Sequence, residues 1–169
     1  MRTRKLTALA LLSAIALTIF TLEARIPALI PIPGIKPGLS NIVTVYAVFA
    51  IGAREAALIL AVRIFLGAVF VGNFSTILYS LAGGGAAILI TILLKHFLKK
   101  DQLWVAGCLG AIAHSIGQMA AAILISGTPS LVIYLPIMIA CSIVAGLFTG
   151  LCAQLLVNRG DRLWKTTFK

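Results

Sequence analysis

The chain has 169 residues, of which 61% are hydrophobic and only 11% are charged, and its mean hydropathy is +1.12. A soluble domain of this length needs a far more polar surface, so the composition excludes an ordinary soluble protein. The hydrophobic residues fall in stretches long enough to cross a bilayer as helices, which takes about 17–25 residues each. The composition therefore predicts an all-α polytopic membrane protein with a single domain, residues 1–169.

Six transmembrane helices are expected in chain order. They are placed at Leu6–Leu22, Leu39–Ile51, Glu55–Val71, Ser75–Leu94, Leu103–Ile125 and Leu131–Val157. The second is short for a span, and the sixth is long enough to include an interfacial end. Basic residues precede the first helix, as in a signal peptide, but no small-residue cleavage motif follows Leu22. We therefore expect the first helix to be retained.

The basic residues alternate between the two sides of the predicted membrane. The two ends of the chain and the connections after the second and fourth helices carry eleven Lys and Arg residues. The other connections carry only Arg25 and Lys36. The positive-inside rule then predicts a multi-pass protein of the cell inner (cytoplasmic) membrane with both termini in the cytoplasm. The net charge of +10 is mainly this topology signal, with attraction to anionic lipid secondary, and no nucleic-acid partner is expected.

Arg63 and His114 are the ionisable side chains placed near the middle of predicted spans. A charge at that depth costs at least about 2.5–3.5 kcal/mol on insertion scales, so it normally faces a partner, a cavity or a ligand. Other polar residues fall at the same depth or further out. The candidate substrate-binding residues are Lys36, Asn41, Arg63, Asn73, Tyr79, His114 and Gln118. This distribution is typical of a ligand site in the outer mouth of a helical bundle.

Several of these residues also have purely structural interpretations. Asn41 and Asn73 are suited to cap helices, and Tyr79 is suited to the interfacial aromatic belt. A neutral His114 can bond to a neighbouring carbonyl group. Arg63 can instead form a structural ion pair with Glu23 or with Glu55, which lie at the ends of predicted spans.

The charges favour an anionic ligand. The four acidic residues lie at span ends, as Glu23 and Glu55 do, or on the cytoplasmic side, as Asp101 and Asp161 do. A site that contains Arg63 without a mid-membrane carboxylate prefers a carboxylate or a phosphate. We therefore expect a small or amphipathic ligand that carries one of these groups.

The outer connection at residues 23–38 contains four prolines and two glycines. Proline fixes backbone torsions and glycine permits turns, so an ordered segment is predicted, as a lid over the bundle or as an interfacial anchor. The Gly83–Gly85 run marks close packing or a helix break. Ala10 and Ala14 form a step of small residues, suited to internal packing or to docking of another membrane subunit. Ser142, Gly146 and Gly150 form a second stripe, which favours internal packing.

Several kinds of chemistry have no motif in the sequence. There is no P-loop and no paired-aspartate motif for a diphosphate, and neither a metal-ligand cluster nor a nucleophile–base–acid set is found. We therefore expect neither enzymatic activity nor a metal or other cofactor. Active transport then needs an ATP-hydrolysing partner, since no intramembrane carboxylate offers coupling to an ion gradient.

Three segments resemble a known family. They are Pro33–Asn41 (PGIKPGLSN), Tyr79–Gly84 (YSLAGG) and His114–Gln118 (HSIGQ). The chain resembles the heptaprenyl diphosphate synthase component I family, also called the Gx transporter family, over roughly Leu6–Gly150. That family is similar to the substrate-binding S components of energy-coupling factor (ECF) transporters.

The resemblance implies a six-helix subunit with a gating loop at residues 23–38. Such subunits capture a vitamin or metabolite, expected here to be isoprenoid- or vitamin-related, and pair with a transmembrane scaffold subunit and two ATPases. Their first helix commonly presents an Ala-x-x-x-Ala face to the scaffold, which Ala10 and Ala14 match. The alternative is a non-catalytic membrane component of polyprenyl diphosphate or quinone synthesis.

Overall fold

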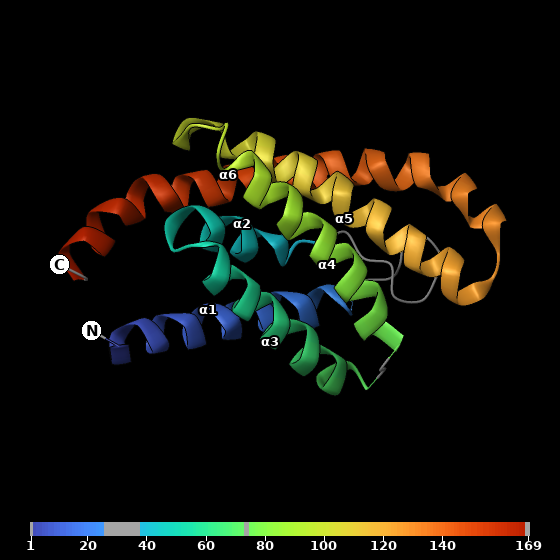
Figure 1. The fold of residues 1–169 in the computed structure, drawn as a ribbon, viewed down its shortest axis with the longest axis horizontal. Helices are drawn as coiled ribbons and strands as arrows, with labels where there is room; N and C mark the ends of the chain where they lie inside the picture. The colour runs from blue at the N-terminus through green and yellow to red at the C-terminus, as the bar shows by residue number, and fades with distance from the viewer. Residues whose placement is uncertain (1, 26–37, 73–74, 168–169) are drawn as a thin grey trace.

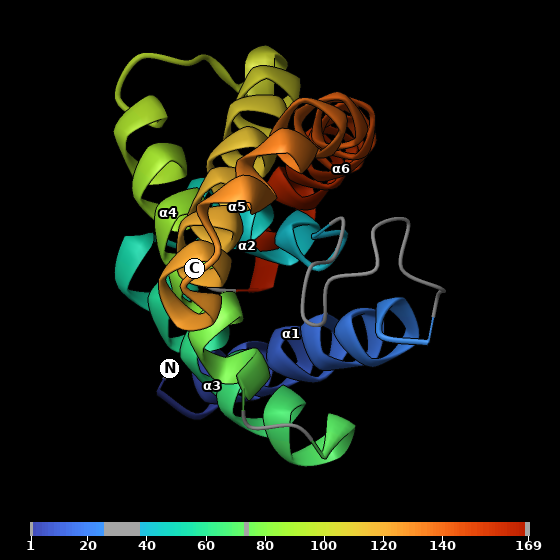
Figure 2. The same ribbon diagram turned by 90° about the vertical axis from the view of Figure 1, so that its right-hand side faces the viewer.

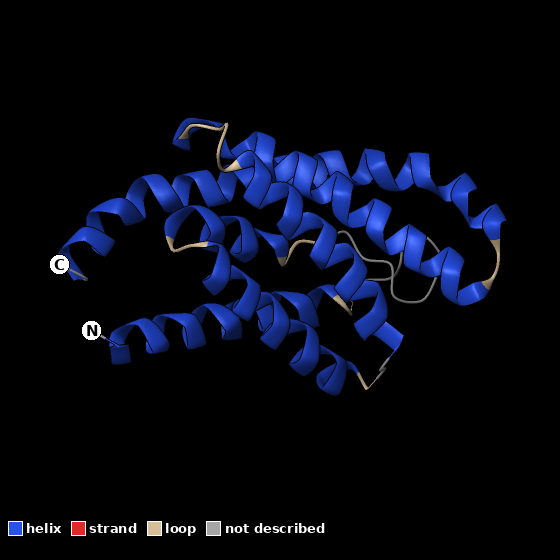
Figure 3. Cartoon of the chain, viewed as in Figure 1, coloured by secondary structure: helices blue, strands red, loops and turns tan. Residues whose placement is uncertain are grey.

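A computed structural model describes residues 2–25, 38–72 and 75–167 (Figure 1). The helices are α1 (Arg2–Glu23), α2 (Asn41–Ala50), α3 (Ala53–Val71), α4 (Ser75–Leu94), η1 (Lys100–Gln102), α5 (Leu103–Ser126), η2 (Pro129–Tyr134) and α6 (Leu135–Thr167). The described residues contain no strand (Figure 3). The predicted all-α fold class is confirmed. Most of the predicted gating loop, residues 26–37, lies outside the described residues.

The expected helix bounds hold closely for α4 and less well for α6. The structure begins and ends α4 at the predicted residues Ser75 and Leu94. The prediction that the last helix starts at Leu131 was wrong, because residues 129–134 form the 3-10 helix η2, with a proline in its first turn. The α-helix starts at Leu135 and continues to Thr167, beyond the predicted end.

Among the described residues, four helical segments are long and apolar enough to cross a membrane. They are Thr3–Glu23, Thr76–Leu94, Lys100–Ser126 and Pro129–Gly160. The helix α2 has only 10 residues. The helix α3 has 19 residues but includes Arg54, Glu55 and Arg63. Neither helix is among the four segments, and the count of six spans remains a prediction.

The helices form two groups with α2 between them. In both views, α1 and α3 lie on one side of the bundle and α5 and α6 on the other (Figure 1, Figure 2). Both ends of the chain lie at the same end of the bundle (Figure 1). The α5–α6 contact depends on glycine, because a Cβ atom on Gly107 would lie 2.5 Å from both the Gly146 carbonyl oxygen and the Gly150 Cα. The predicted stripe of small residues on α6 therefore serves internal packing.

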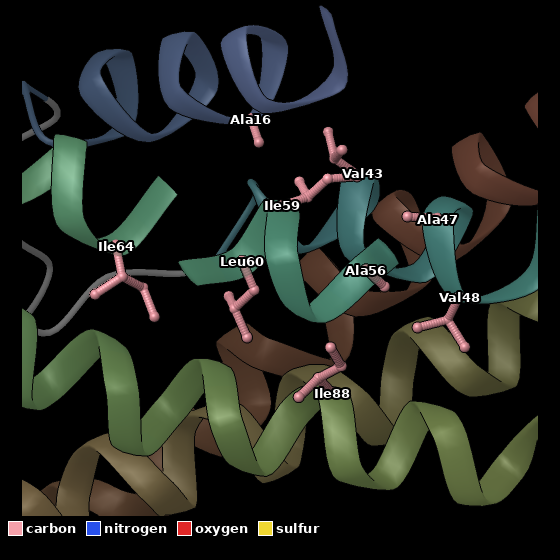
Figure 4. Packing of buried hydrophobic residues seen from close by; sticks show 9 residues of the cluster. All are labelled: Ala16, Val43, Ala47, Val48, Ala56, Ile59, Leu60, Ile64 and Ile88. Carbon is pink, nitrogen blue, oxygen red and sulfur yellow. The ribbon is translucent and has the colours of Figure 1, made fainter. Parts of the chain in front are cut away.

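An apolar core joins α1, α2, α3 and α4. Its members are Ala16, Val43, Ala47, Val48, Ala56, Ile59, Leu60, Ile64 and Ile88 (Figure 4). The residues from α3 occupy positions i, i+3, i+4 and i+8, which lie on one face of the helix. Arg63 lies on this buried face as well, so the fold carries a guanidinium group into the apolar centre of the bundle.

The short helix α2 is held at both ends by side chains from other helices. At its C-terminal end, Lys95 Nζ donates to the Val48 carbonyl oxygen at 2.6 Å. A cation at that position satisfies an orphan carbonyl and complements the helix dipole. At its N-terminal end, Ser40 accepts a hydrogen bond from Arg63. These contacts fix where α2 begins, and its beginning forms part of the candidate site.

Candidate functional site

A small polar pocket lies where α1 ends and α2 begins, against α3, α4 and α5. It is lined by Phe20, Glu23, Gly38, Ser40, Arg63, Ser80, His114 and Gln118. Its polar side chains are all buried, with exposed fractions between 1% and 6%. The space between them is sufficient for about one water-sized group. The pocket is therefore small, and most of its lining is polar.

Arg63 forms the floor of this pocket. Its side chain is 2% exposed, and its Nη1 donates to the hydroxyl of Ser40. The guanidinium carbon lies 5.6 Å from the centroid of the Phe20 ring, which is within the range of a cation–π contact. Its Nε has no hydrogen-bond partner in the described part of the chain. Arg63 is thus held in position while one of its donors remains available.

Glu23 is the carboxylate nearest to this site. It is the last residue of α1 and is 3% exposed, and its Oε1 accepts hydrogen bonds from the backbone N–H groups of Gly38 (2.5 Å) and Leu39 (3.1 Å). It also interacts electrostatically with Arg63. The expectation of a site without a carboxylate was therefore wrong, because the end of α1 folds inward and the polar start of α2 covers it.

The alternative in which Arg63 pairs with Glu55 was wrong as well. Glu55 lies in the first turn of α3, two turns before Arg63, and forms a salt bridge with Lys5 of α1. Because the two helices meet there, the ion pair ties their ends together. Glu23 is therefore the acidic neighbour of Arg63.

His114 and Gln118 project from one face of α5 towards α4, as their spacing of four residues predicts. They are 3% and 2% exposed, and the His114 ring forms a hydrogen bond with the main chain of Gly83. A Cβ atom on Gly83 would lie 2.6 Å from Gln118 Cγ, and one on Gly84 would lie 3.2 Å from Arg63 Nη2. The glycine run therefore permits close packing at the site, and α4 continues through it without a break.

Asn41 is the first residue of α2 and is 4% exposed. Within the described ranges, neither its Oδ1 nor its Nδ2 has a hydrogen-bond partner. The interpretation of Asn41 as a helix cap was wrong, since Ser40 occupies the N-cap position and no side-chain cap bond forms. A buried amide with both polar atoms unsatisfied is unusual, because such groups are nearly always paired in native structures.

Of the remaining predicted residues, the structure describes Tyr79, Ala10 and Ala14. Tyr79 packs in an apolar cluster with Ala121 and Ala122, and it is not part of the pocket lining. Lys36 and Asn73 lie outside the described residues. Ala10 and Ala14 are both exposed on α1.

Sequence reasoning missed five residues that line the pocket. They are Phe20, Glu23, Gly38, Ser40 and Ser80. Gly38, Ser40 and Ser80 fall within the segments that carry the family resemblance, so those segments were the available signal. Phe20 had no such signal, since an aromatic residue near a helix end is usual at a membrane interface. Glu23 was considered only as a structural ion-pair partner of Arg63.

The comparisons with known proteins decide the family. The family model described as heptaprenyl diphosphate synthase component I matches residues 12–156. The chain belongs to this family. The matched region includes all eight residues of the pocket. Neither the curated proteins nor the solved structures contain a significant match. The resemblance drawn from the sequence motifs is therefore confirmed at the level of the family.

Proposed function

We propose that the chain is the substrate-binding membrane subunit of an ATP-driven importer of the energy-coupling factor type. Its ligand is a small anionic or amphipathic metabolite, isoprenoid- or vitamin-related. The chain is not itself an enzyme. The observation that carries this proposal is the buried Arg63 in a small polar pocket inside a largely apolar bundle.

A purely structural role explains this site poorly. Arg63 Nε, His114 Nδ1 and both amide atoms of Asn41 are buried without partners in the described ranges. Each buried unsatisfied polar group costs about 1–3 kcal/mol. A bundle evolved only for stability would have these positions filled by apolar residues. A ligand that bonds to them offsets the cost, and the guanidinium favours an anionic group on that ligand.

The partners follow from what the sequence lacks. With no P-loop in the chain, ATP hydrolysis falls to separate ATPases, reached through a transmembrane scaffold subunit. Exposed Ala10 and Ala14 on α1 suit this contact, because small residues let membrane helices approach closely. In this arrangement both termini are cytoplasmic and the pocket faces the opposite side of the inner membrane, in agreement with the distribution of basic residues.

The second candidate is a non-catalytic membrane component of polyprenyl diphosphate or quinone synthesis. It is favoured by the description of the family itself. In that case the apolar bundle supplies lipid contact to a soluble prenyltransferase, and the pocket accommodates a headgroup or an isoprenoid end group.

Purification of the tagged chain from its native membrane distinguishes the two. Co-purification of a membrane scaffold and ATPases supports the importer, whereas a prenyltransferase supports the alternative and contradicts the proposal. Native mass spectrometry of the same sample identifies any retained small molecule. We expect the molecule in the parent and in Lys5→Gln, a surface control, and its loss in Arg63→Met. Equal retention in Arg63→Met would show that Arg63 does not hold the ligand.

A further inference from the structure

Beside the pocket lies the side-chain amide of Asn41. An anionic ligand by itself does not explain why this amide is buried there. A carboxylate or phosphate on the ligand satisfies donors, such as Arg63 Nε and Asn41 Nδ2. It offers nothing to Asn41 Oδ1, which can only accept a hydrogen bond. Both atoms are buried and without a partner among the described residues. Beside the pocket there is therefore a donor next to an acceptor, and the two require a complementary pair.

Asn41 lies next to the pocket, beside Gly38. Gly38 has φ +79°, a conformation that glycine adopts without strain. A Cβ atom on Gly38 would lie 3.0 Å from Asn41 Nδ2 and 3.2 Å from the His114 ring. Gly38 also lines the pocket, so it separates the pocket from the Asn41 amide. The amide is therefore one glycine away from the cavity, and no side chain at position 38 blocks it.

Access to Asn41 requires a movement of the segment that Glu23 holds. The Glu23 carboxylate fixes the N–H groups of Gly38 and Leu39, and Arg63 fixes the hydroxyl of Ser40. These bonds hold the start of α2 against the site, with space left for about one water-sized group. An anionic ligand competes with Ser40 for Arg63, so binding at the floor of the pocket loosens the segment that covers Asn41.

We propose, building on the proposed function, that the ligand carries a planar edge with adjacent hydrogen-bond donor and acceptor, such as a carboxamide, a lactam or a ring N–H next to a carbonyl, besides its anionic group. Asn41 Oδ1 accepts from the N–H of this edge, and Asn41 Nδ2 donates to its carbonyl oxygen. Arg63 binds the anion. Asn41 is thus the residue that determines specificity among small anions.

Three probes of nearly equal shape test this. Succinamate has a carboxylate and a carboxamide, levulinate replaces the amide NH₂ by a methyl group, and 4-methylpentanoate also lacks the carbonyl. Their affinities for the full chain in lipid nanodiscs are measured by ligand-observed NMR. We expect succinamate to bind roughly five- to tenfold more tightly than levulinate, because levulinate leaves Asn41 Oδ1 unsatisfied. We also expect 4-methylpentanoate to bind most weakly.

Two variants assign the effect to Asn41. Asn41→Leu should remove the differences among the three probes and should leave the ligand-free chain at least as stable as the parent, because the replaced amide makes no hydrogen bond. Arg63→Met should weaken all three probes together. Equal affinities in the parent, a succinamate preference that survives in Asn41→Leu, or failure of all three probes to bind would overturn the proposal.

This outcome is separable from that of the proposed function. If a scaffold and ATPases co-purify but succinamate binds no more tightly than levulinate, the proposed importer function is supported and the proposed donor–acceptor edge on the ligand is refuted. If a prenyltransferase co-purifies while the preference for succinamate depends on Asn41, the proposed donor–acceptor edge is supported and the proposed importer function is refuted.

Discussion

Replacing Gly83 by alanine tests whether α4 and α5 meet at the candidate site. Gly83, Gly84 and Gly85 are consecutive in α4, so they share nearly the same helical context. A Cβ atom on Gly83 would lie 2.6 Å from Gln118 Cγ and 2.9 Å from the His114 carbonyl oxygen. A Cβ atom on Gly85 would meet nothing within 4 Å. The neighbouring glycine is therefore a matched control.

The magnitude follows from two opposing effects. Alanine favours a helix over glycine by up to about 1 kcal/mol, and both variants gain this. Only Gly83→Ala adds an atom into a closely packed contact, which typically costs about 1–3 kcal/mol. The flexible Gln118 side chain can shift, but the His114 carbonyl belongs to the α5 backbone and moves only with the helix. We therefore expect Gly83→Ala to be less stable than Gly85→Ala by about 1–3 kcal/mol.

Equilibrium unfolding in mixed dodecyl maltoside and SDS micelles measures this difference. Gly85→Ala should match the parent or exceed it slightly. Binding of succinamate should weaken in Gly83→Ala as well, because His114 and Gln118 are displaced. If Gly83→Ala proved as stable as Gly85→Ala, the close approach of α4 to α5 at this point would be refuted.

Three further predictions concern other contacts. Gly107→Ala should destabilise the chain by about 1–3 kcal/mol in the same assay, because its Cβ would clash with the α6 backbone. A stability equal to that of the parent would contradict the close contact between α5 and α6 at this glycine. Lys5→Ala should cost no more than about 1 kcal/mol, since its side chain is 49% exposed in the salt bridge with Glu55, and a larger loss would reveal a further role. Glu23→Gln should cost about 1–3 kcal/mol, because two backbone N–H groups then bond to a neutral oxygen beside Arg63; an unchanged unfolding midpoint would show that the charge is unimportant.

The hydrophobic pattern was sufficient to predict that the helices exist, but not all of their bounds or the type of each helical segment. The apolar run of α4 is bounded by polar residues at both ends, and its bounds were predicted correctly. The start of α6 was not, because the apolar run continues across η2 and gives no sign of the change in helix type. Segments of equal hydrophobicity can differ in local backbone geometry, which depends on packing against neighbouring helices.

The candidate site was predictable in part, since polar side chains within or at the ends of apolar runs are visible in the sequence. Arg63, His114, Gln118 and Asn41 were all identified in this way, and the structure buries all four. The sequence left open whether Glu23 or Glu55 lies beside Arg63, because both acids lie at span ends. The burial of Glu23 depends on the way that residues 38 and 39 fold over the end of α1.

The sequence by itself determined the all-helical membrane character and the few polar residues that burial makes costly, because these depend on composition and local periodicity. Only the tertiary structure decided which acid lies beside Arg63, that Gly83 and Gly84 admit the α5 and α3 side chains, and that Asn41 is left without partners. Those facts depend on contacts between helices that are distant in the chain. Contacts of this kind are set by how closely the backbones approach, which no local pattern of residues specifies.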